Sequence, residues 1–278
     1  MPSTPKILPR SREPMFNIPG VVVASLAVLV GIHAVVSFLS GPAAFQAILD
    51  FGFVPAVWTL YVDPGALESI LENALSGEAA ERSARLAFAQ FVLAQAPAGP
   101  WSFLTYALLH GSWTHVGLNG MWLAAFGTPI ARRCGTLRFL ALAALTALAG
   151  ALAHWASHAH DTTPMVGASA AVSGMMAAAA RFMFTPLHPD DAALFSGHAH
   201  LRPRQSLADL ARNRRVLIFL GIWFAINLVF GYAAVPLGLA EGGIAWEAHL
   251  GGFLAGFLLF PLMDPYREHP GLGERTSS

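Results

Sequence analysis

The sequence predicts an all-α membrane protein in which six transmembrane helices form one bundle, with a long outer loop after the first helix. Three observations lead to this prediction. Hydrophobic residues make up 55% of the 278 residues and charged residues only 12%, whereas a soluble globular domain carries roughly 25% charged residues. Apolar runs recur six times, most of them close to the roughly 20 residues that span a bilayer. Lysine and arginine gather beside alternate ends of these runs, as they do in multi-pass membrane proteins.

Composition also excludes several classes of function. The formal net charge is zero, and no basic stripe with interleaved aromatic residues is present, so we expect no nucleic-acid partner. Cys134 is the single cysteine, which rules out an intrachain disulfide. Spacings typical of nucleotide or zinc-finger sites do not occur. We therefore expect a protein that works in the lipid bilayer without a cofactor.

The chain begins with a polar, proline-rich segment, residues 1–17, that we expect to be a disordered cytoplasmic tail. The membrane domain then extends over residues 18–263, and its first apolar run covers residues 21–39. A cleaved signal peptide is the alternative, because cations precede the run. Its apolar core is longer than the roughly 7–15 residues usual in signal peptides, so a retained helix is favoured. For His33 in this run, a hydrogen-bonded or pore-facing side chain is favoured over a ligand role.

Residues 41–112 form the predicted outer loop. Turn signals such as Asp63-Pro64-Gly65 alternate with amphipathic pieces, and residues 67–91 have the apolar spacing of one or two helices at the membrane interface. We expect a structural insert without chemistry of its own. The remaining apolar runs follow it, at residues 113–130, 137–155, 168–184, 216–232 and 244–263. Residues 264–278 form a polar cytoplasmic tail.

The distribution of basic residues predicts the orientation in the membrane. With six crossings, fourteen of the sixteen lysines and arginines fall on the side of the N-terminus, and only Arg82 and Arg85 in the insert do not. Because basic residues favour the cytoplasmic side, both termini are predicted to be cytoplasmic. The insert and the start of the run at 168–184 then face outward, in a multi-pass protein of the cell membrane.

Polar residues inside three of the runs suggest chemistry, because such residues are costly in a bilayer. His115 and Asn119 lie four residues apart and share a helix face, with His110 just before that run. Their N–H groups suit stabilisation of an oxyanion. Structural hydrogen bonds between helices explain the same pair equally well.

Ser169 lies at the start of the fourth run, where the free N–H groups and the dipole of a helix N-terminus favour an anion. The small residues around it, Gly167, Ala170 and Gly174, are equally typical of close helix packing. His249 lies in the last run, one turn before the pair Gly252 and Gly256. If this small face packs against the fourth run, the imidazole of His249 comes within reach of Ser169 as a general base. Since we find no acidic residue in the other runs to orient it, we expect a Ser–His dyad.

These motifs together resemble the rhomboid family of intramembrane serine proteases. The resemblance is carried by "WSFLTYALLHGSWTHVGLNGMWLAAFG", "GASAAVSG" and "AHLGGFLAG", in this order, over about residues 100 to 262. It implies a six-helix bundle whose site opens to the outer face, with Ser169 as nucleophile and His249 as base. Asn119, His115 and the Ser169 backbone N–H would form the oxyanion hole, and the substrate would be the transmembrane segment of another membrane protein.

Two positions depart from the family pattern. Ala170 stands where the family usually has glycine, and Ser173 stands where an aromatic side chain commonly stacks on the base. Ser173 shares a face with Ser169 and is a second candidate nucleophile, although Ser169 fits the motif better. These departures keep open the alternative of a catalytically inactive rhomboid-like protein that binds membrane helices. A solute transporter is disfavoured, because no inverted repeat is visible.

Metal ligands are not assigned. His154, His158 and His160 with Asp161 follow one another at the outer end of the third run, but their spacing matches no strong ligand pattern, and a hydrated loop is the favoured interpretation. The same holds for His188, His198 and His200 on the inner side.

Overall fold

The computed structural model describes residues 18–76, 78–185, 199–233 and 245–266. The predicted tail 1–17 and nearly all of the predicted tail 264–278 lie outside them. Within the described residues, the only β-type pairing is an isolated bridge between Phe53 and Met165. The all-α prediction is therefore confirmed for this part of the chain.

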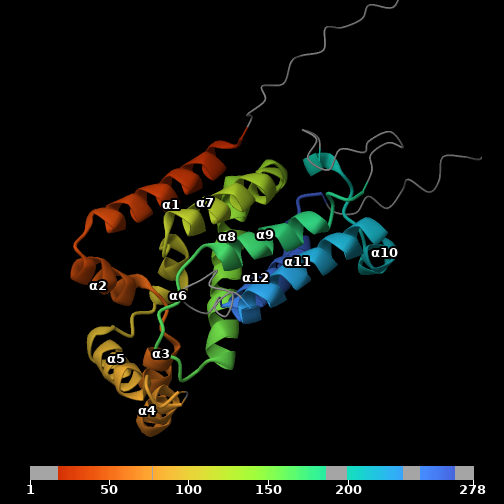
Figure 1. The fold of residues 1–278 in the computed structure, drawn as a ribbon. Helices are drawn as coiled ribbons and strands as arrows, with labels where there is room; N and C mark the ends of the chain where they lie inside the picture. Colours follow the sequence, from red (N-terminus) through yellow and green to blue (C-terminus); the bar gives the residue numbers. More distant parts are fainter. Residues whose placement is uncertain (1–17, 77, 186–198, 234–244, 267–278) are drawn as a thin grey trace, which may run out of the picture.

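A helix covers each of the predicted apolar runs (Figure 1). These helices are α1 (Gly20–Phe38), α7 (Trp113–Trp122), α8 (Thr128–Ser157), α9 (Ser169–Ala180), α11 (Arg214–Ala233) and α12 (Trp246–Met263). By length and composition, three stretches could cross a bilayer, namely Gly20–Phe38, Trp113–Ser157 and Trp246–Met263, while Ser169–Ala180 is apolar but shorter. The chain is thus built as a membrane protein, and six crossings remain a prediction.

Within the second run, a π-helical turn, η3 (Leu123–Gly127), joins α7 directly to α8. Between the second and third runs the chain is broken by a kink at Gly135, whose φ is +76°, and helical residues stand on both sides of it. This backbone conformation favours glycine, because a Cβ would be strained there. One glycine therefore redirects the chain where we expected a loop.

The insert is helical rather than irregular. It contains α2 (Gly41–Phe51), α3 (Pro55–Val62), η1 (Pro64–Ala66), α4 (Leu67–Leu75), α5 (Arg82–Gln95), α6 (Ser102–Thr105) and η2 (Tyr106–Leu108). The helices predicted within residues 67–91 are present as α4 and α5. Thr59 in α3 donates a 2.7 Å hydrogen bond to the Ala159 carbonyl and accepts one from the Trp155 indole. The insert is thereby attached to the C-terminal end of α8.

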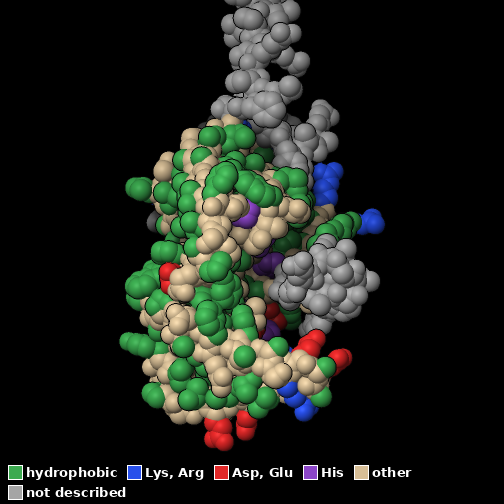
Figure 2. Space-filling model, turned by 60° about the vertical axis from the view of Figure 1, so that its left-hand side comes forward, with side chains coloured by type: hydrophobic (Ala, Val, Ile, Leu, Met, Phe, Trp, Pro, Cys, Tyr) green, Lys and Arg blue, Asp and Glu red, His purple; other side chains and the backbone are tan. Residues whose placement is uncertain are grey.

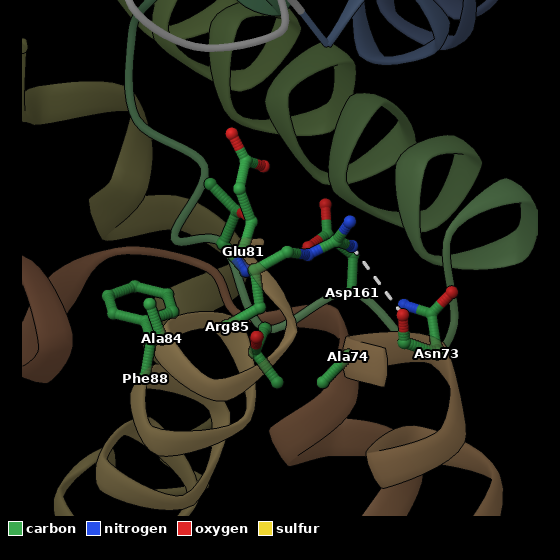
Figure 3. A pocket seen from close by; sticks show the side chains of 9 residues that line it. Asn73, Ala74, Glu81, Ala84, Arg85, Phe88 and Asp161 are labelled. Atoms are coloured by element: carbon green, nitrogen blue, oxygen red, sulfur yellow. Dashed lines mark hydrogen bonds between the residues drawn. The ribbon is translucent and has the colours of Figure 1, made fainter. Parts of the chain in front are cut away.

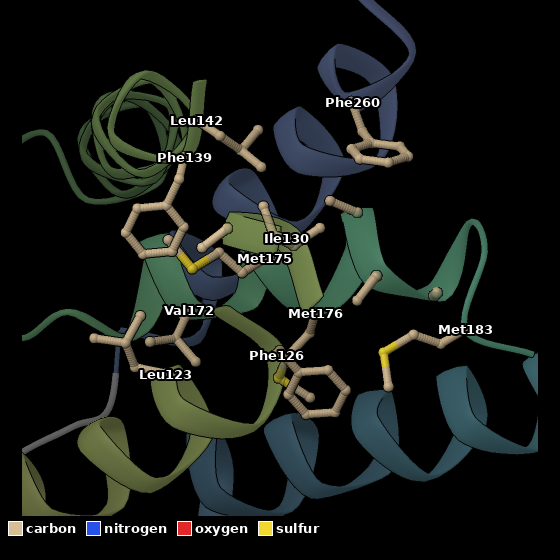
Figure 4. Close-up of a cluster of buried hydrophobic side chains, with 14 of the residues drawn as sticks. Leu123, Phe126, Ile130, Phe139, Leu142, Val172, Met175, Met176, Met183 and Phe260 are labelled. Carbon is tan, nitrogen blue, oxygen red and sulfur yellow. The ribbon is translucent and has the colours of Figure 1, made fainter. Parts of the chain in front are cut away.

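Helix α9 lies at the centre of the bundle, between α7, α8 and α12 (Figure 1). From Ala170 to Ala180 each of its residues is buried, which fits its alanine-, glycine- and methionine-rich sequence, since a helix apolar on all sides belongs in a core. Met175 and Met176 project into a cluster with Leu123, Phe126 and Phe139 (Figure 4). The chain segment that carries Ser169 is therefore rigidly held.

A buried ion pair ties together the opposite end of the bundle. The guanidinium of Arg133 donates to both carboxylate oxygens of Asp264, at 2.8 and 2.9 Å, and both side chains are fully buried. Arg133 also donates to the carbonyls of His200 and Arg202. Arg133, one of the basic residues between the second and third apolar runs, thus links α8 to the end of α12, to η4 (Ala199–Leu201) and to the segment before α10 (Leu207–Arg212).

Large hydrophobic side chains are exposed on the outer helices, including Val35, Leu140, Ile222 and Leu258. Hydrophobic side chains spread over much of the face in Figure 2, while acidic side chains stand mostly at the lower end of the molecule and basic ones both there and at its upper right edge. Such an apolar surface would be unfavourable in water and suits contact with lipid.

Candidate active site

Ser169 is the first residue of α9 and is half-buried. The loop that leads to it is fixed by Tyr106, whose carbonyl accepts a 2.9 Å hydrogen bond from the Gly167 N–H. The Tyr106 hydroxyl is itself buried and donates to the Ala147 carbonyl at 2.8 Å. Gly167 has a φ of +126°, and a Cβ there would lie 2.7 Å from the His115 ring. Only glycine satisfies both constraints.

Helices α9 and α12 touch backbone to backbone. A Cβ on Gly252 would overlap the Ala170 carbonyl, and a Cβ on Gly256 would overlap the carbonyl of Gly174. Because both contacts advance by four residues, the two helices run in the same direction in register. The predicted packing of the small faces is therefore present.

This register determines which residues lie at the N-terminal end of the contact between α9 and α12. Ser169 directly precedes Ala170, and His249 lies one turn before Gly252 in α12, on nearly the same helix face. Both side chains thus belong to the N-terminal end of the α9–α12 contact. The C-terminal end of α8 and the start of α7 reach the same region, through Gly150 and His115 respectively.

The imidazole of His249 has a partner that sequence reasoning missed. Its Nδ1 lies 2.6 Å from Oδ1 of Asn227 in α11. Nδ2 of Asn227 donates a 2.8 Å hydrogen bond to the Trp223 carbonyl one turn earlier, which fixes the orientation of the amide. Oδ1 is therefore the acceptor and Nδ1–H of His249 the donor, so the lone pair of the neutral ring lies on Nε2. The sequence signal that could have indicated this partner is the polar side chain of Asn227 within the apolar run 216–232.

Asn119 and His115 lie beside the loop before Ser169. A Cβ on Gly167 would lie 2.7 Å from the His115 ring and 3.7 Å from the Asn119 Nδ2 atom. Asn119 is buried, and its Nδ2 has no hydrogen-bond partner among the described residues. An amide donor left unpaired in a core is costly, and this one lies near Gly167 in the loop that leads to Ser169.

His110 supports the same loop. Its Nε2 accepts a 3.4 Å hydrogen bond from the Ala168 N–H, and its ring lies 5.0 Å from that of His115 in an edge-on arrangement. Burial, with a smaller contribution from the nearby His115 and His33, lowers the pKa of His110 to about 4. His110 is thus neutral at pH 7, as its acceptor role requires. Nδ1 of His33 donates to the His110 carbonyl at 3.0 Å, so this histidine has a structural hydrogen bond.

The structure accommodates the two departures from the family pattern. The methyl group of Ala170 points at Gly150 in α8, where a Cβ would collide with it. Ser173 is buried one turn deeper than Ser169, with only 5% of its surface exposed. Ser169 is therefore the more accessible of the two hydroxyls.

Of the residues expected in a hydrated loop, His158, His160 and Asp161 are partly exposed after the end of α8, whereas His154 lies within that helix. His154 is buried, and its ring stacks on that of His158. Their acidic neighbour is Glu247 of α12. His188 and His198 lie outside the described residues, and His200 contributes a carbonyl to Arg133.

A separate pocket of about 470 Å³ lies in the insert, between α4, α5 and residues 161–163 (Figure 3). Arg85 extends across it and donates to the carbonyls of Ser76 and Asn73. None of the predicted site residues lines this pocket. Histidine side chains are instead visible in a hollow higher on the molecule (Figure 2).

Comparison with known proteins agrees with the sequence motifs. The family model for the Rhomboid domain matches residues 97–264, which include Ser169, His249 and Asn119. Over 169 residues the chain is 29% identical to "Rhomboid protease GlpG" of Pectobacterium atrosepticum. This alignment covers 60% of the chain and 50% of that relative, so the chain spans about half the length of the curated protein it matches.

Proposed function

Because this chain belongs to the rhomboid family, we propose that it is an intramembrane serine endopeptidase that cleaves transmembrane segments of other membrane proteins. The observation that carries the proposal is the register of α9 on α12. The backbone contact of Ala170 with Gly252 supports a pairing of Ser169 with His249 at one end of the two helices.

In the proposed reaction, Nε2 of His249 accepts the proton of the Ser169 hydroxyl while the serine Oγ attacks the scissile carbonyl carbon. The tetrahedral intermediate collapses as the imidazolium donates that proton to the leaving amine. A water molecule, activated by the same imidazole, then hydrolyses the acyl-enzyme. Ordinary serine chemistry needs no cofactor.

The negative charge of the intermediate would be stabilised by Nδ2 of Asn119, the ring N–H of His115 and the Ser169 backbone N–H. The unpartnered buried amide of Asn119 supports this role, because a donor oriented before the reaction need not reorganise during it. The N–H groups of the first turn of α9 and the helix dipole favour the same charge.

We further propose that Asn227 holds His249 in its reactive tautomer. An amide oxygen that accepts from Nδ1–H leaves Nε2 free to act as the base, and an asparagine also serves as the third member of the Cys–His–Asn triad. The catalytic unit would then be Ser169, His249 and Asn227 rather than a dyad alone. In this unit Asn227 is a positioning residue, since it acts on the serine only through the histidine.

The proposed topology has six crossings, both termini in the cytoplasm and the site open to the outer face. The parallel direction of α9 and α12 supports it, since the fourth and sixth crossings must run the same way. The start of α7 and the C-terminal part of α8 both lie near the N-terminal end of α9. This also fits the arrangement, because the second and third crossings must run in opposite directions. The predicted substrates would then meet the site at the outer side of the bilayer.

The alternative remains a rhomboid-like protein that binds membrane helices without cleaving them. Ala170 and Ser173 are the residues that favour it. The space that Gly150 leaves for the Ala170 methyl weakens this argument, because the added carbon does not force α9 and α12 apart.

The test is cleavage of a model transmembrane substrate by the purified chain in liposomes. We expect cleavage by the unmodified protein and by Ser173→Ala, and none by Ser169→Ala or His249→Ala. Capture of the substrate without cleavage by the unmodified protein would favour the binding alternative. Release of ectodomains from cells, compared with and without active Ser169, would identify natural substrates.

A further inference from the structure

Three side chains that the proposed reaction does not use converge where α8 ends and α12 begins. His154 and His158 lie one turn apart at the C-terminal end of α8, and Glu247 lies in the first turn of α12. Their ligand atoms all fall within 4.8 Å of one another. His154 is buried, and the other two are only partly exposed.

The distances in this cluster leave a gap at its centre. Nδ1 of His154 lies 3.8 Å from one carboxylate oxygen of Glu247, and Nε2 of His158 lies 3.8 Å from the other. Both separations are too long for hydrogen bonds. Nδ1 of His154 is buried and has no hydrogen-bond partner among the described residues. In a tetrahedral site with bonds of roughly 2.0–2.2 Å, neighbouring ligand atoms lie about 3.4 Å apart, so binding requires these side chains to approach one another from separations of 3.8 Å and up to 4.8 Å.

We propose that His154, His158 and Glu247 bind one Zn²⁺ ion, with water in the fourth position. Two histidines at positions i and i+4 of a helix plus one carboxylate form a ligand set that zinc enzymes also use. Two imidazoles favour zinc over Mg²⁺ or Ca²⁺, which prefer sites made of oxygen atoms. The sequence alone assigned no metal ligands to these histidines, because Glu247 reaches them only through the packing of α12 on α8.

The proposed site would connect α8 to α12. Glu247 lies two residues before His249, so a bound ion attaches the first turn of α12 to the end of α8. Because the ion would bind the folded chain and not the unfolded one, it would raise the free energy of unfolding by mass action. The binding itself does not require Ser169 and goes beyond the proposed function.

The experiment is Zn²⁺ titration of the purified, untagged full-length chain in detergent, followed by metal analysis and thermal unfolding. We expect one tightly bound Zn²⁺ per chain and a rise in the unfolding midpoint, with no rise for Mg²⁺ or Ca²⁺. His158→Ala and Glu247→Gln are expected to lower the affinity by at least about tenfold and to abolish the rise, since even residues that only support a metal ligand contribute 10–100-fold. The side chain of His158 is 40% exposed, so its removal leaves the fold intact.

His160→Ala is the matched control, because His160 is a neighbouring histidine outside the cluster, and it should bind Zn²⁺ like the unmodified chain. Unchanged binding in both His158→Ala and Glu247→Gln would overturn the proposal, as would the absence of a stoichiometric site. Repeating the titration with Ser169→Ala separates this result from the proposed function. That variant should bind Zn²⁺ normally whether or not the chain is a protease.

Discussion

Oδ1 of Asn227 lies 2.6 Å from Nδ1 of His249, and this contact joins α11 to α12. The amide is oriented by its second hydrogen bond, to the Trp223 carbonyl. Trp223 in turn stacks on Phe253, at a centroid distance of 4.3 Å. The imidazole is therefore held by a polar contact that packed aromatic rings keep in place.

Replacing Asn227 tests its positioning role. Asn227→Leu keeps the size of the side chain but removes the hydrogen-bond acceptor. We expect kcat to fall about 10–100-fold, because losing one buried hydrogen bond costs about 1–3 kcal/mol. KM should stay unchanged. Asn227→Asp retains an oxygen acceptor and should recover part of kcat, while Ile226→Ala on the exposed side of α11 serves as control. Normal kcat in Asn227→Leu would remove Asn227 from the catalytic unit.

Asn119→Ala tests the proposed oxyanion hole. Removing one such donor typically costs about 10²–10³ in rate, so cleavage should slow by that factor without stopping. Substrate binding should be retained, since the interaction forms in the transition state. The measurement is kcat on a model transmembrane substrate, with Leu118→Ala, an exposed neighbour, as control. If Asn119→Ala cleaved at the normal rate, its amide would have a structural role only.

Gly150 and Ala170 should behave as a coupled pair. In Gly150→Ala the new Cβ would meet the Ala170 methyl and lie 2.8 Å from the Ala248 carbonyl. Overpacking of this kind costs about 1–3 kcal/mol, and the thermal midpoint in detergent should fall. The double variant Gly150→Ala with Ala170→Gly should recover part of the loss, because one of the two collisions is removed. Additive effects of the two substitutions would contradict this contact.

Breaking the pair of Arg133 and Asp264 should destabilise the bundle strongly. Asp264→Ala leaves a guanidinium buried without its carboxylate, a situation that costs about 3–5 kcal/mol. Denaturant titration in detergent measures the change. Arg138→Ala removes an exposed cation from the same helix and should change stability by less than about 0.5 kcal/mol. A double-mutant cycle with Arg133→Met should give a loss smaller than the sum of the single changes.

The sequence predicted much of this arrangement, and its successes have a common basis. Ser169, Gly252 and Gly256 are recognisable because close helix packing requires small residues at fixed spacing. The helices themselves follow from long apolar runs. The position of Asn119 beside the serine loop follows from its spacing to His115, since both share one face of α7.

Other contacts could not be predicted, because they depend on how helices rotate against one another. Asn227 lies in an apolar run that gives no indication of which neighbour its amide faces, and our search for an orienting group considered only acidic residues. Arg133 and Asp264 are separated by 131 positions in the chain, so charge counting placed the arginine in a loop. Glu247 likewise pairs with histidines of α8 that only the folded chain brings near.

The central claim is that His249 activates Ser169. It is tested most directly by treating the folded chain with a fluorophosphonate and locating the adduct by mass spectrometry. The account predicts an adduct on Ser169 that disappears in His249→Ala while the thermal midpoint of the protein is retained. An adduct on Ser173 instead, or labelling of Ser169 that is unchanged in His249→Ala, would contradict it.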